Sequence, residues 1–337
     1  MKRILPLLTI AIATTFLFSS CMKEEKPYPV PEPPKSEGEF KVLNSQVTMG
    51  EDYGTQIYFS FTTGQAYTSN VKSWDVSFTT GTDNNELWMN SGMPVQMYPT
   101  GNTNYAAITT KVGIAANAWK YDSPSGLTGK SGLGILSNQN HVGEVLIVDG
   151  GENIFFKLQI LEITSTQYKI KAGPLEAATG SEYTLAKDDN YNFIYFSFNN
   201  GIVKPEPPKK DWDILFTRYR TVYYKYNPDG SDFPYPVNGV LTNPYKTQSA
   251  GDSTKSYEFY PFSVEDATDF FTLKSDRDAI GYNWKSVNIN TGQYTVKPKS
   301  IYLVKDQNDA LWKLHFVNFY DAGGKKGSPQ FEYQRLK

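Results

Sequence analysis

Hydrophobic and polar positions alternate in two matching stretches of the chain. Residues 57–64 (IYFSFTTG) are followed by residues 74–79 (WDVSFT), and residues 194–201 (IYFSFNNG) are followed by residues 212–217 (WDILFT). Alternation with a period of two is typical of strands with one buried face, and glycine after polar residues marks a turn. Each stretch therefore predicts a strand, a turn, a loop and a second strand that opens with Trp-Asp.

The far ends of the two stretches also match. Residues 145–149 and 155–158 flank a Gly/Asn turn, while residues 301–305 and 311–314 flank a turn of Gln, Asn and Asp. Two apolar alternating runs around a short polar turn predict a β-hairpin. The same hairpin is thus expected near the end of both stretches.

The order of these blocks predicts how the chain is organised. Because they recur in the same order, we predict two related β units, residues 40–175 and residues 176–337, joined near the turn-forming residues 172–180. No segment carries a long helical period, and residues 264–271 amount to two turns. The predicted fold class is therefore all-β and antiparallel. The pattern leaves open whether the units are two domains or one body.

The N-terminus follows the pattern of an export signal. Lys2 and Arg3 precede an apolar run at residues 4–18 that is too short to span a bilayer stably. The run ends in Phe-Ser-Ser before Cys21, which resembles a bacterial lipobox, where the thiol is lipidated and the chain is cut before it. We predict a signal peptide at residues 1–20 and a lipid anchor at Cys21. An ordinary secretory signal is the alternative.

Residues 21–39 are expected to form a tether to the membrane. Proline is dense in residues 27–34 and favours an extended polyproline-II spacer. Cys21 is the only cysteine, so the mature chain has no internal disulfide and no cysteine-based metal site.

Composition narrows the class of ligand. The net charge of -2 argues against a nucleic-acid partner, which needs a basic face. Aromatic residues make up 15% of the chain, including 24 tyrosines, and this suits twisted sheets and aromatic-lined pockets. Enzyme signatures are poor: Gly129-Lys130-Ser131 resembles a phosphate-binding loop, but the earlier glycine that such a loop requires falls on Pro124. We expect a binding protein rather than an enzyme.

The second unit contains YFSF at residues 195–198, KDWDILFTRY at 210–219 and KLHFVNFYD at 313–321, with FEY at 331–333. With these blocks in this order, it resembles the HmuY family of Bacteroidetes heme-binding lipoproteins. The first unit shows a weaker half of the same pattern. The resemblance implies an HmuY-like all-β protein that captures heme and passes it to a TonB-dependent outer-membrane receptor.

The family resemblance also implies two axial histidines or methionines between the Trp-Asp strand and the closing hairpin, and this chain departs from that. Residues 212–304 contain neither residue type. Tyrosinate also binds heme iron, and that region holds several tyrosines. Those weighed as ligands are Tyr235, Tyr245, Tyr257, Tyr260, Tyr282 and Tyr294.

Three methionines form a separate candidate site. Met89, Met93 and Met97 recur every fourth residue, but Gly92 and Pro94 oppose a helix, so they would share a face of an extended chain. Thioether pairs hold heme iron in some family members. Packing in irregular gaps of the core is the alternative.

The remaining conspicuous residues are expected to have structural roles. His315 and its counterpart Gln159 are predicted on a partly solvated sheet face, and His141 at a strand entry. The Trp-Asp pairs are expected to define the fold, with each Asp binding a backbone amide. Residues 227–232, rich in oxygen donors, predict a hairpin turn rather than a calcium loop.

The N-terminus and the family resemblance together predict location and partners. Residues 22–26 (MKEEK) resemble the signal that sends Bacteroidetes lipoproteins to the outer face of the outer membrane. We therefore expect a surface lipoprotein that binds heme or a related porphyrin for uptake with a TonB-dependent receptor. The alternative is a lipoprotein of the same fold that binds a siderophore or glycan, or acts only as a receptor partner.

Overall fold

Antiparallel sheets account for most of the regular structure in the computed structural model, which describes residues 40–252 and 254–337. The all-β antiparallel class is thus confirmed. The expected signal peptide, Cys21 and the tether lie outside the described residues. The described residues belong to one compact unit. None of their helices is both long and apolar enough to cross a bilayer.

Two of the sheets share one hydrophobic core. A five-stranded sheet has the order β10-β9-β8-β7-β6, and a four-stranded sheet has the order β12-β11-β4-β5. Buried side chains from both sheets, such as Phe78, Leu158 and Phe196, meet in this core. The strands are β4 (Val76–Thr79), β5 (Leu87–Met89), β6 (Gln96–Pro99), β7 (Val145–Asp149), β8 (Phe155–Ile163), β9 (Gln167–Pro174), β10 (Ser181–Ala186), β11 (Phe193–Ser197) and β12 (Gly201–Val203).

A second pair of sheets shares another core. Their orders are β1-β20-β19-β18-β15 and β14-β13-β2-β3. Phe59, Phe216 and Phe316 contribute to this core from different strands. The strands are β1 (Leu43–Gln46), β2 (Thr55–Phe59), β3 (Ala66–Asn70), β13 (Ile214–Tyr223), β14 (Phe233–Thr242), β15 (Gln248–Gly251), β18 (Tyr302–Lys305), β19 (Leu311–Tyr320) and β20 (Lys326–Arg335).

Short elements complete the fold. Helix α1 (Val264–Phe270) begins with a capping box in which Ser263 and Asp266 bind each other's backbone amides. It falls at the two-turn segment expected from the sequence. A two-stranded ribbon joins β16 (Lys285–Val287) to β17 (Tyr294–Val296). The 3-10 turns are η1 (Val71–Ser73), η2 (Tyr105–Ala107) and η3 (Ala116–Ala118).

The local predictions at turns and hairpins are confirmed. Strands β7 and β8 form one closing hairpin, and β18 and β19 form the other. Residues 227–232 join β13 to β14, as a hairpin turn would. Gly64 and Gly201 have φ angles of 67° and 71°, a left-handed conformation that glycine adopts without strain, and each ends the turn after its Tyr-Phe-Ser-Phe strand.

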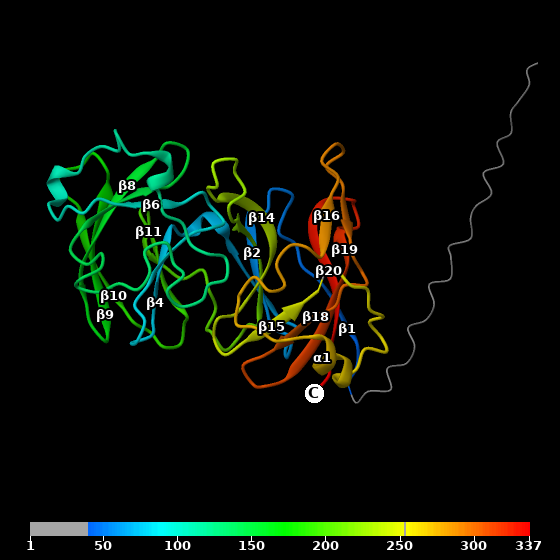
Figure 1. Ribbon diagram of the computed structural model, residues 1–337. Helices are drawn as coiled ribbons and strands as arrows, with labels where there is room; N and C mark the ends of the chain where they lie inside the picture. The colour runs from blue at the N-terminus through cyan, green and yellow to red at the C-terminus, as the bar shows by residue number, and fades with distance from the viewer. Residues whose placement is uncertain (1–39, 253) are drawn as a thin grey trace, which may run out of the picture. The chain divides into compact units, whose positions relative to one another are not determined.

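Strand pairing crosses between the two predicted units. Strand β2 pairs with β13, with Ile57 opposite Phe216, and β11 pairs with β4, with Ile194 opposite Phe78. In Figure 1 the blue strand β2 accordingly belongs to the same sheet as the yellow-green strand β14. Each Tyr-Phe-Ser-Phe strand therefore pairs with the Trp-Asp strand of the other unit.

The two four-stranded sheets correspond strand by strand. The order β12-β11-β4-β5 matches β3-β2-β13-β14, with the Tyr-Phe-Ser-Phe and Trp-Asp strands at the centre of both. Trp74 meets Tyr195, and Trp212 meets Tyr58, each with ring centroids 4.9 Å apart and planes at 79°. The division of the sequence at residues 175/176 stays a prediction, and strands from both sides of it contribute to both cores.

Candidate functional site

An aromatic cleft lies between the β13–β14 hairpin and the segment that carries β16 and β17. Its cavity volume is about 590 Å³, within the range usual for small-molecule sites. Six aromatic side chains and two lysines contribute to its lining: Tyr223, Tyr226, Phe233, Tyr235, Tyr282, Tyr294, Lys285 and Lys297.

The hairpin provides a platform of stacked rings at this cleft. Tyr223 and Phe233 stand directly opposite each other in the β13–β14 register, and Tyr235 follows two residues later, so all three share one sheet face. The Tyr226 ring stacks on Phe233 at 5.5 Å and 26°. Tyr226 is 68% exposed and Tyr235 45%. Exposed, clustered aromatic rings are typical of a surface that binds a partner or ligand.

Two of the tyrosines that line the cleft are hydrogen-bonded to each other. The hydroxyls of Tyr223 and Tyr282 lie 2.7 Å apart in a hydrogen bond. Burial and this contact with Tyr223 raise the pKa of Tyr282 well above its usual value. The Tyr282 phenol is therefore protonated at neutral pH, and it would have to lose a proton to bind a metal as tyrosinate.

Lys285 places a buried amine at the cleft. The residue is 7% exposed, and its Nζ donates to the Asn238 carbonyl oxygen at 2.6 Å. The same Nζ lies 4.0 Å from the Trp284 ring centroid and 4.9 Å from that of Phe319. Burial lowers the Lys285 pKa to about 7. The amine thus changes charge near neutral pH, and an anion in the cleft would favour its charged form.

The candidate site of three methionines lies away from the cleft, in and beside the core of the β4–β12 sheets. Met89 and Met97 are buried in that core. Met93 is half-buried, and its Sδ accepts a hydrogen bond from Arg218 Nη2 at 3.2 Å. Met89 also lines a cavity of about 70 Å³, far smaller than a typical ligand pocket. Iron ligation by these methionines stays a prediction.

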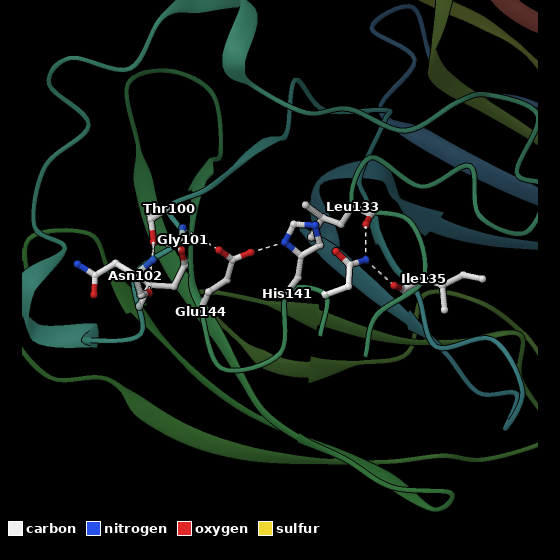
Figure 2. A network of polar contacts seen from close by, with 9 residues as sticks. Thr100, Gly101, Asn102, Leu133, Ile135, His141 and Glu144 are labelled. Atoms are coloured by element: carbon white, nitrogen blue, oxygen red, sulfur yellow. Dashed lines mark hydrogen bonds and ion pairs between the residues drawn. The ribbon is translucent and has the colours of Figure 1, made fainter. Parts of the chain in front are cut away.

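His141 belongs to a local polar network, shown in Figure 2. Its Nδ1 contacts the Glu144 carboxylate, whose other oxygen accepts from the Gly101 backbone amide at 2.7 Å. The neighbouring Asn140 donates to the carbonyl oxygens of Leu133 and Ile135. These contacts bind the entry of β7 to the loops around residues 101 and 133. They give His141 a structural role, as its expected position at a strand entry suggests.

His315 is buried, so its predicted place on a partly solvated face is wrong. It is 7% exposed and stacks on Phe259 at 4.1 Å and 7°. Its Nδ1 lies 2.6 Å from the Pro298 carbonyl oxygen and its Nε2 lies 3.0 Å from Glu332 Oε2. The segment before α1 covers this sheet face, which the local alternation pattern could not reveal. Both ring nitrogens are occupied within the protein.

Sequence reasoning found part of the cleft. Of the six tyrosines weighed as ligands, Tyr235, Tyr282 and Tyr294 line it. Tyr223, Tyr226, Phe233 and Lys285 were missed. The signal for the first three was the run of aromatics on both sides of the predicted turn at residues 227–232. In the described ranges 40–252 and 254–337, no group of three His, Cys, Asp or Glu side chains is placed to hold a metal ion.

The solved structures that match this chain have low sequence identity and low TM-scores. Apo PinO from Porphyromonas gingivitis is 12% identical, with 88% of this chain and 98% of that chain covered at a TM-score of 0.29. The apo HmuY analog of Tannerella forsythia is 10% identical, with 89% and 98% covered at 0.33. A Bacteroides vulgatus protein described as HmuY-like and heme-binding is 10% identical, with 87% and 90% covered at 0.23. No curated protein matches the sequence.

The family comparison is specific to the second half of the chain. The model of the HmuY protein family matches residues 189–333. This range includes the Trp-Asp strand β13, the closing hairpin β18–β19 and all residues that line the aromatic cleft. The resemblance of the second half of the chain to the HmuY family, seen in the sequence, is therefore confirmed by a family-model match over residues 189–333.

Proposed function

We propose that this chain binds heme or a related porphyrin in the aromatic cleft. The observation that carries the proposal is the cleft of about 590 Å³ inside the region matched by the HmuY family. An apolar planar macrocycle is stabilised by stacking on aromatic rings and by removal of its faces from water. The exposed rings of Tyr226, Phe233 and Tyr235 suit such a contact.

The two lysines suit the charged edge of the same ligand. Heme carries two carboxylates, and Lys285 and Lys297 both line the cleft. Lys285 is the more informative, because no acidic side chain in the described part of the chain forms an ion pair with this buried amine, and a bound carboxylate would supply a counter-charge. Bound heme would bring its iron as cargo, and the protein would hold the ring and its carboxylates.

Iron ligation in this cleft would rest on oxygen. The lining contains neither histidine nor methionine, and tyrosine hydroxyls are its strongest candidate donors. Tyr223, Tyr235, Tyr282 and Tyr294 are the candidates, and a ring held without an axial side chain is the other possibility. The same lack of histidine and methionine favours a second candidate function, the binding of a siderophore or glycan on the same aromatic platform.

The sequence of the N-terminus and the family resemblance support a proposal for the cellular role. We propose a lipoprotein anchored through Cys21 in the outer membrane, exposed at the cell surface, that works with a TonB-dependent receptor in uptake. The chain would act as a binding protein, not as an enzyme. A ligand that must be handed on is best held reversibly, and an open cleft lined by exposed rings suits reversible binding.

The cleft can be tested with neighbouring tyrosines of one hairpin. Tyr226 lines the cleft, whereas Tyr224 is similarly exposed, at 64%, and is not part of the lining. Hemin is titrated into protein truncated before residue 40, with binding followed by the Soret band and by tryptophan quenching. We expect Tyr226→Ala to weaken binding at least tenfold and Tyr224→Ala to leave it unchanged. Equal losses in both variants, or no binding by the unmodified chain, would overturn the proposal and favour a non-heme ligand.

A further inference from the structure

A small cavity lies where strand β13 meets residues 89–92 and 122–126. Its volume is about 70 Å³, and it shares no lining residue with the aromatic cleft. Because a buried water needs about 10–15 Å³ of such space, the cavity has room for about five atoms of that size. It is therefore too small for a porphyrin and large enough for a small ion, and the proposed heme function does not use it.

The charge of this cavity lining is mostly positive. Three arginines, Arg218, Arg220 and Arg277, line it together with one acid, Asp122. Burial raises the pKa of Asp122 to about 7. Both carboxylate oxygens of Asp122 already accept hydrogen bonds from backbone amides, at 2.5 Å and 2.7 Å. The single negative charge is thus stabilised by the backbone, and the positive charges outnumber it.

None of the three arginines has an ion-pair partner in the described part of the chain, where every ion pair involves a lysine or a histidine. Arg220 is 6% exposed and interacts at longer range with Asp122 and, more weakly, with Asp149. Arg277 interacts with two acids that lie outside the lining. A buried guanidinium without an ion pair is costly, and a bound anion would lower that cost.

The guanidinium groups of Arg218 and Arg220 also have unused donors. Arg218 donates from Nε to the Gly92 carbonyl oxygen and from Nη2 to Met93 Sδ. Arg220 donates from Nη1 and Nη2 to the Val95 carbonyl oxygen, both at 3.1 Å. A guanidinium has five N–H groups, and each arginine uses two of them here, so three remain on each.

Two of these nitrogens are open to the space around them. Among residues 40–252 and 254–337, Arg218 Nη1 and Arg220 Nε have no hydrogen-bond partner, yet neither belongs to the polar atoms that are buried without one. Each is therefore reached by solvent-sized space. Because both arginines line the cavity, their free N–H groups are available to an anion inside it.

We propose that this cavity binds a small tetrahedral oxyanion, phosphate or sulfate, held by Arg218 and Arg220. Such an ion has five heavy atoms, which matches the room in the cavity. The planar fork of an arginine presents paired N–H donors that suit the oxygens of an oxyanion. Hydroxyl groups that can donate to the remaining oxygens line the same cavity, on Ser77, Ser91, Ser123 and Thr217.

The probe for this proposal is inorganic phosphate. It is added to the chain truncated before residue 40, which keeps every described residue of the compact unit. Binding is measured at neutral pH by equilibrium dialysis with radiolabelled phosphate. Sodium chloride keeps the ionic strength constant, and sulfate serves as the competitor.

Three variants are compared with the unmodified chain. Arg218→Gln removes the charge of a half-buried side chain, and Arg218→Lys keeps the charge but loses the planar fork. Arg335→Gln is the matched control, because Arg335 is an exposed arginine outside the cavity lining. Circular dichroism checks that each variant is folded.

We expect one phosphate per chain, displaced by sulfate and not by chloride at the same ionic strength. The affinity should fall at least tenfold in Arg218→Gln, fall less in Arg218→Lys and stay unchanged in Arg335→Gln. Absence of saturable binding, equal binding by Arg218→Gln, an equal loss in Arg335→Gln, or displacement by chloride would each overturn the proposal. If Arg218→Gln does not fold, unchanged affinity in Arg218→Lys would overturn it instead. Hemin binding should be the same in all variants, since none of these arginines lines the aromatic cleft.

Discussion

The carboxylate of Asp213 accepts a hydrogen bond from the backbone amide of Phe61 at 2.7 Å, across 152 residues of sequence. Asp75 does the same for the amide of Phe198, at 2.8 Å and across 123 residues. The expected role of each Trp-Asp aspartate, to bind a backbone amide, is confirmed. In both cases the amide belongs to the last phenylalanine of the Tyr-Phe-Ser-Phe block of the other predicted unit, so each aspartate links the two units through a hydrogen bond.

The first prediction concerns these aspartates. Asp213→Ala leaves the buried amide of Phe61 without its acceptor, which should lower the free energy of unfolding by about 1–3 kcal/mol. Asp75→Ala should cost a similar amount through Phe198. Asp211→Ala, at an exposed position two residues before Asp213, should change stability by less than about 0.5 kcal/mol. Urea unfolding measures all three, and a loss confined to the Asp211 variant would contradict the assignment.

The second prediction uses the pH dependence of stability at Lys285. Burial lowers the pKa of Lys285 in the folded chain to about 7, against about 10.4 in an unfolded chain. Between these two pKa values the unfolded state binds a proton that the folded state lacks, so the free energy of unfolding rises with pH. Below pH 7 the amine is charged in both states, and the full cost of burying that charge is present.

Lys285→Met removes this dependence. The difference in free energy of unfolding between variant and unmodified protein should therefore move in favour of the unmodified protein as the pH rises from 6 to 9. Lys313, whose pKa burial also lowers, to about 8, is present in both proteins, so its contribution cancels. Unfolding curves at pH 6, 7.5 and 9 supply the measurement. A constant difference across this range would show that Lys285 does not titrate in it.

The third prediction is that hemin binding depends on the oxidation state of iron. With only tyrosine oxygens available as strong donors in the cleft, ferric iron should bind more tightly than ferrous iron. Because the pKa of Tyr282 is raised, ligation by Tyr282 would release a proton and ferric affinity would increase with pH. Titrations with and without dithionite test this, and equal affinity in both states would argue against a tyrosine ligand. No Soret shift in either state would reject iron ligation.

The methionines provide the control for that experiment. A thioether ligand favours ferrous iron, so the methionine site predicts the opposite preference. Met93→Leu keeps the volume of the side chain and removes the sulfur that Arg218 contacts. Unchanged hemin binding in Met93→Leu supports the tyrosine cleft. Loss of ferrous binding in this variant would instead support ligation by the methionine group.

The fourth prediction is that Cys21 holds the protein at the membrane. Multiple acyl chains on one cysteine give a stable anchor, since each buried methylene contributes about 0.8 kcal/mol. Cys21→Ala should therefore move the protein from the membrane fraction to a soluble or unprocessed form, detected by fractionation and immunoblotting. Protease shaving of intact cells tests surface exposure. Retention of Cys21→Ala in the outer-membrane fraction would mean that another contact holds it there.

Local sequence determined the elements of this protein. Alternation at residues 57–61 and 194–198, the apolar runs around polar turns, and the Ser263 capping box act within a few residues, so strands, hairpins and α1 could be predicted from the chain. The family resemblance was equally readable, because it rests on short blocks such as Trp212-Asp213 in a fixed order. The composition further indicated an aromatic-rich chain that suits twisted sheets and aromatic-lined pockets.

Tertiary structure alone decided which of these elements meet. The backbone hydrogen bonds between two strands have the same pattern whether the strands are near or far apart in sequence. The residues of β2 and β13 therefore do not by themselves specify that these two strands pair with each other. The cleft is likewise assembled from residues 223–237 and residues 282–297, which face each other only after folding. The burial of His315 has the same origin: the solvent exposure of a side chain depends on which distant segments cover it, and a one-dimensional pattern does not contain that.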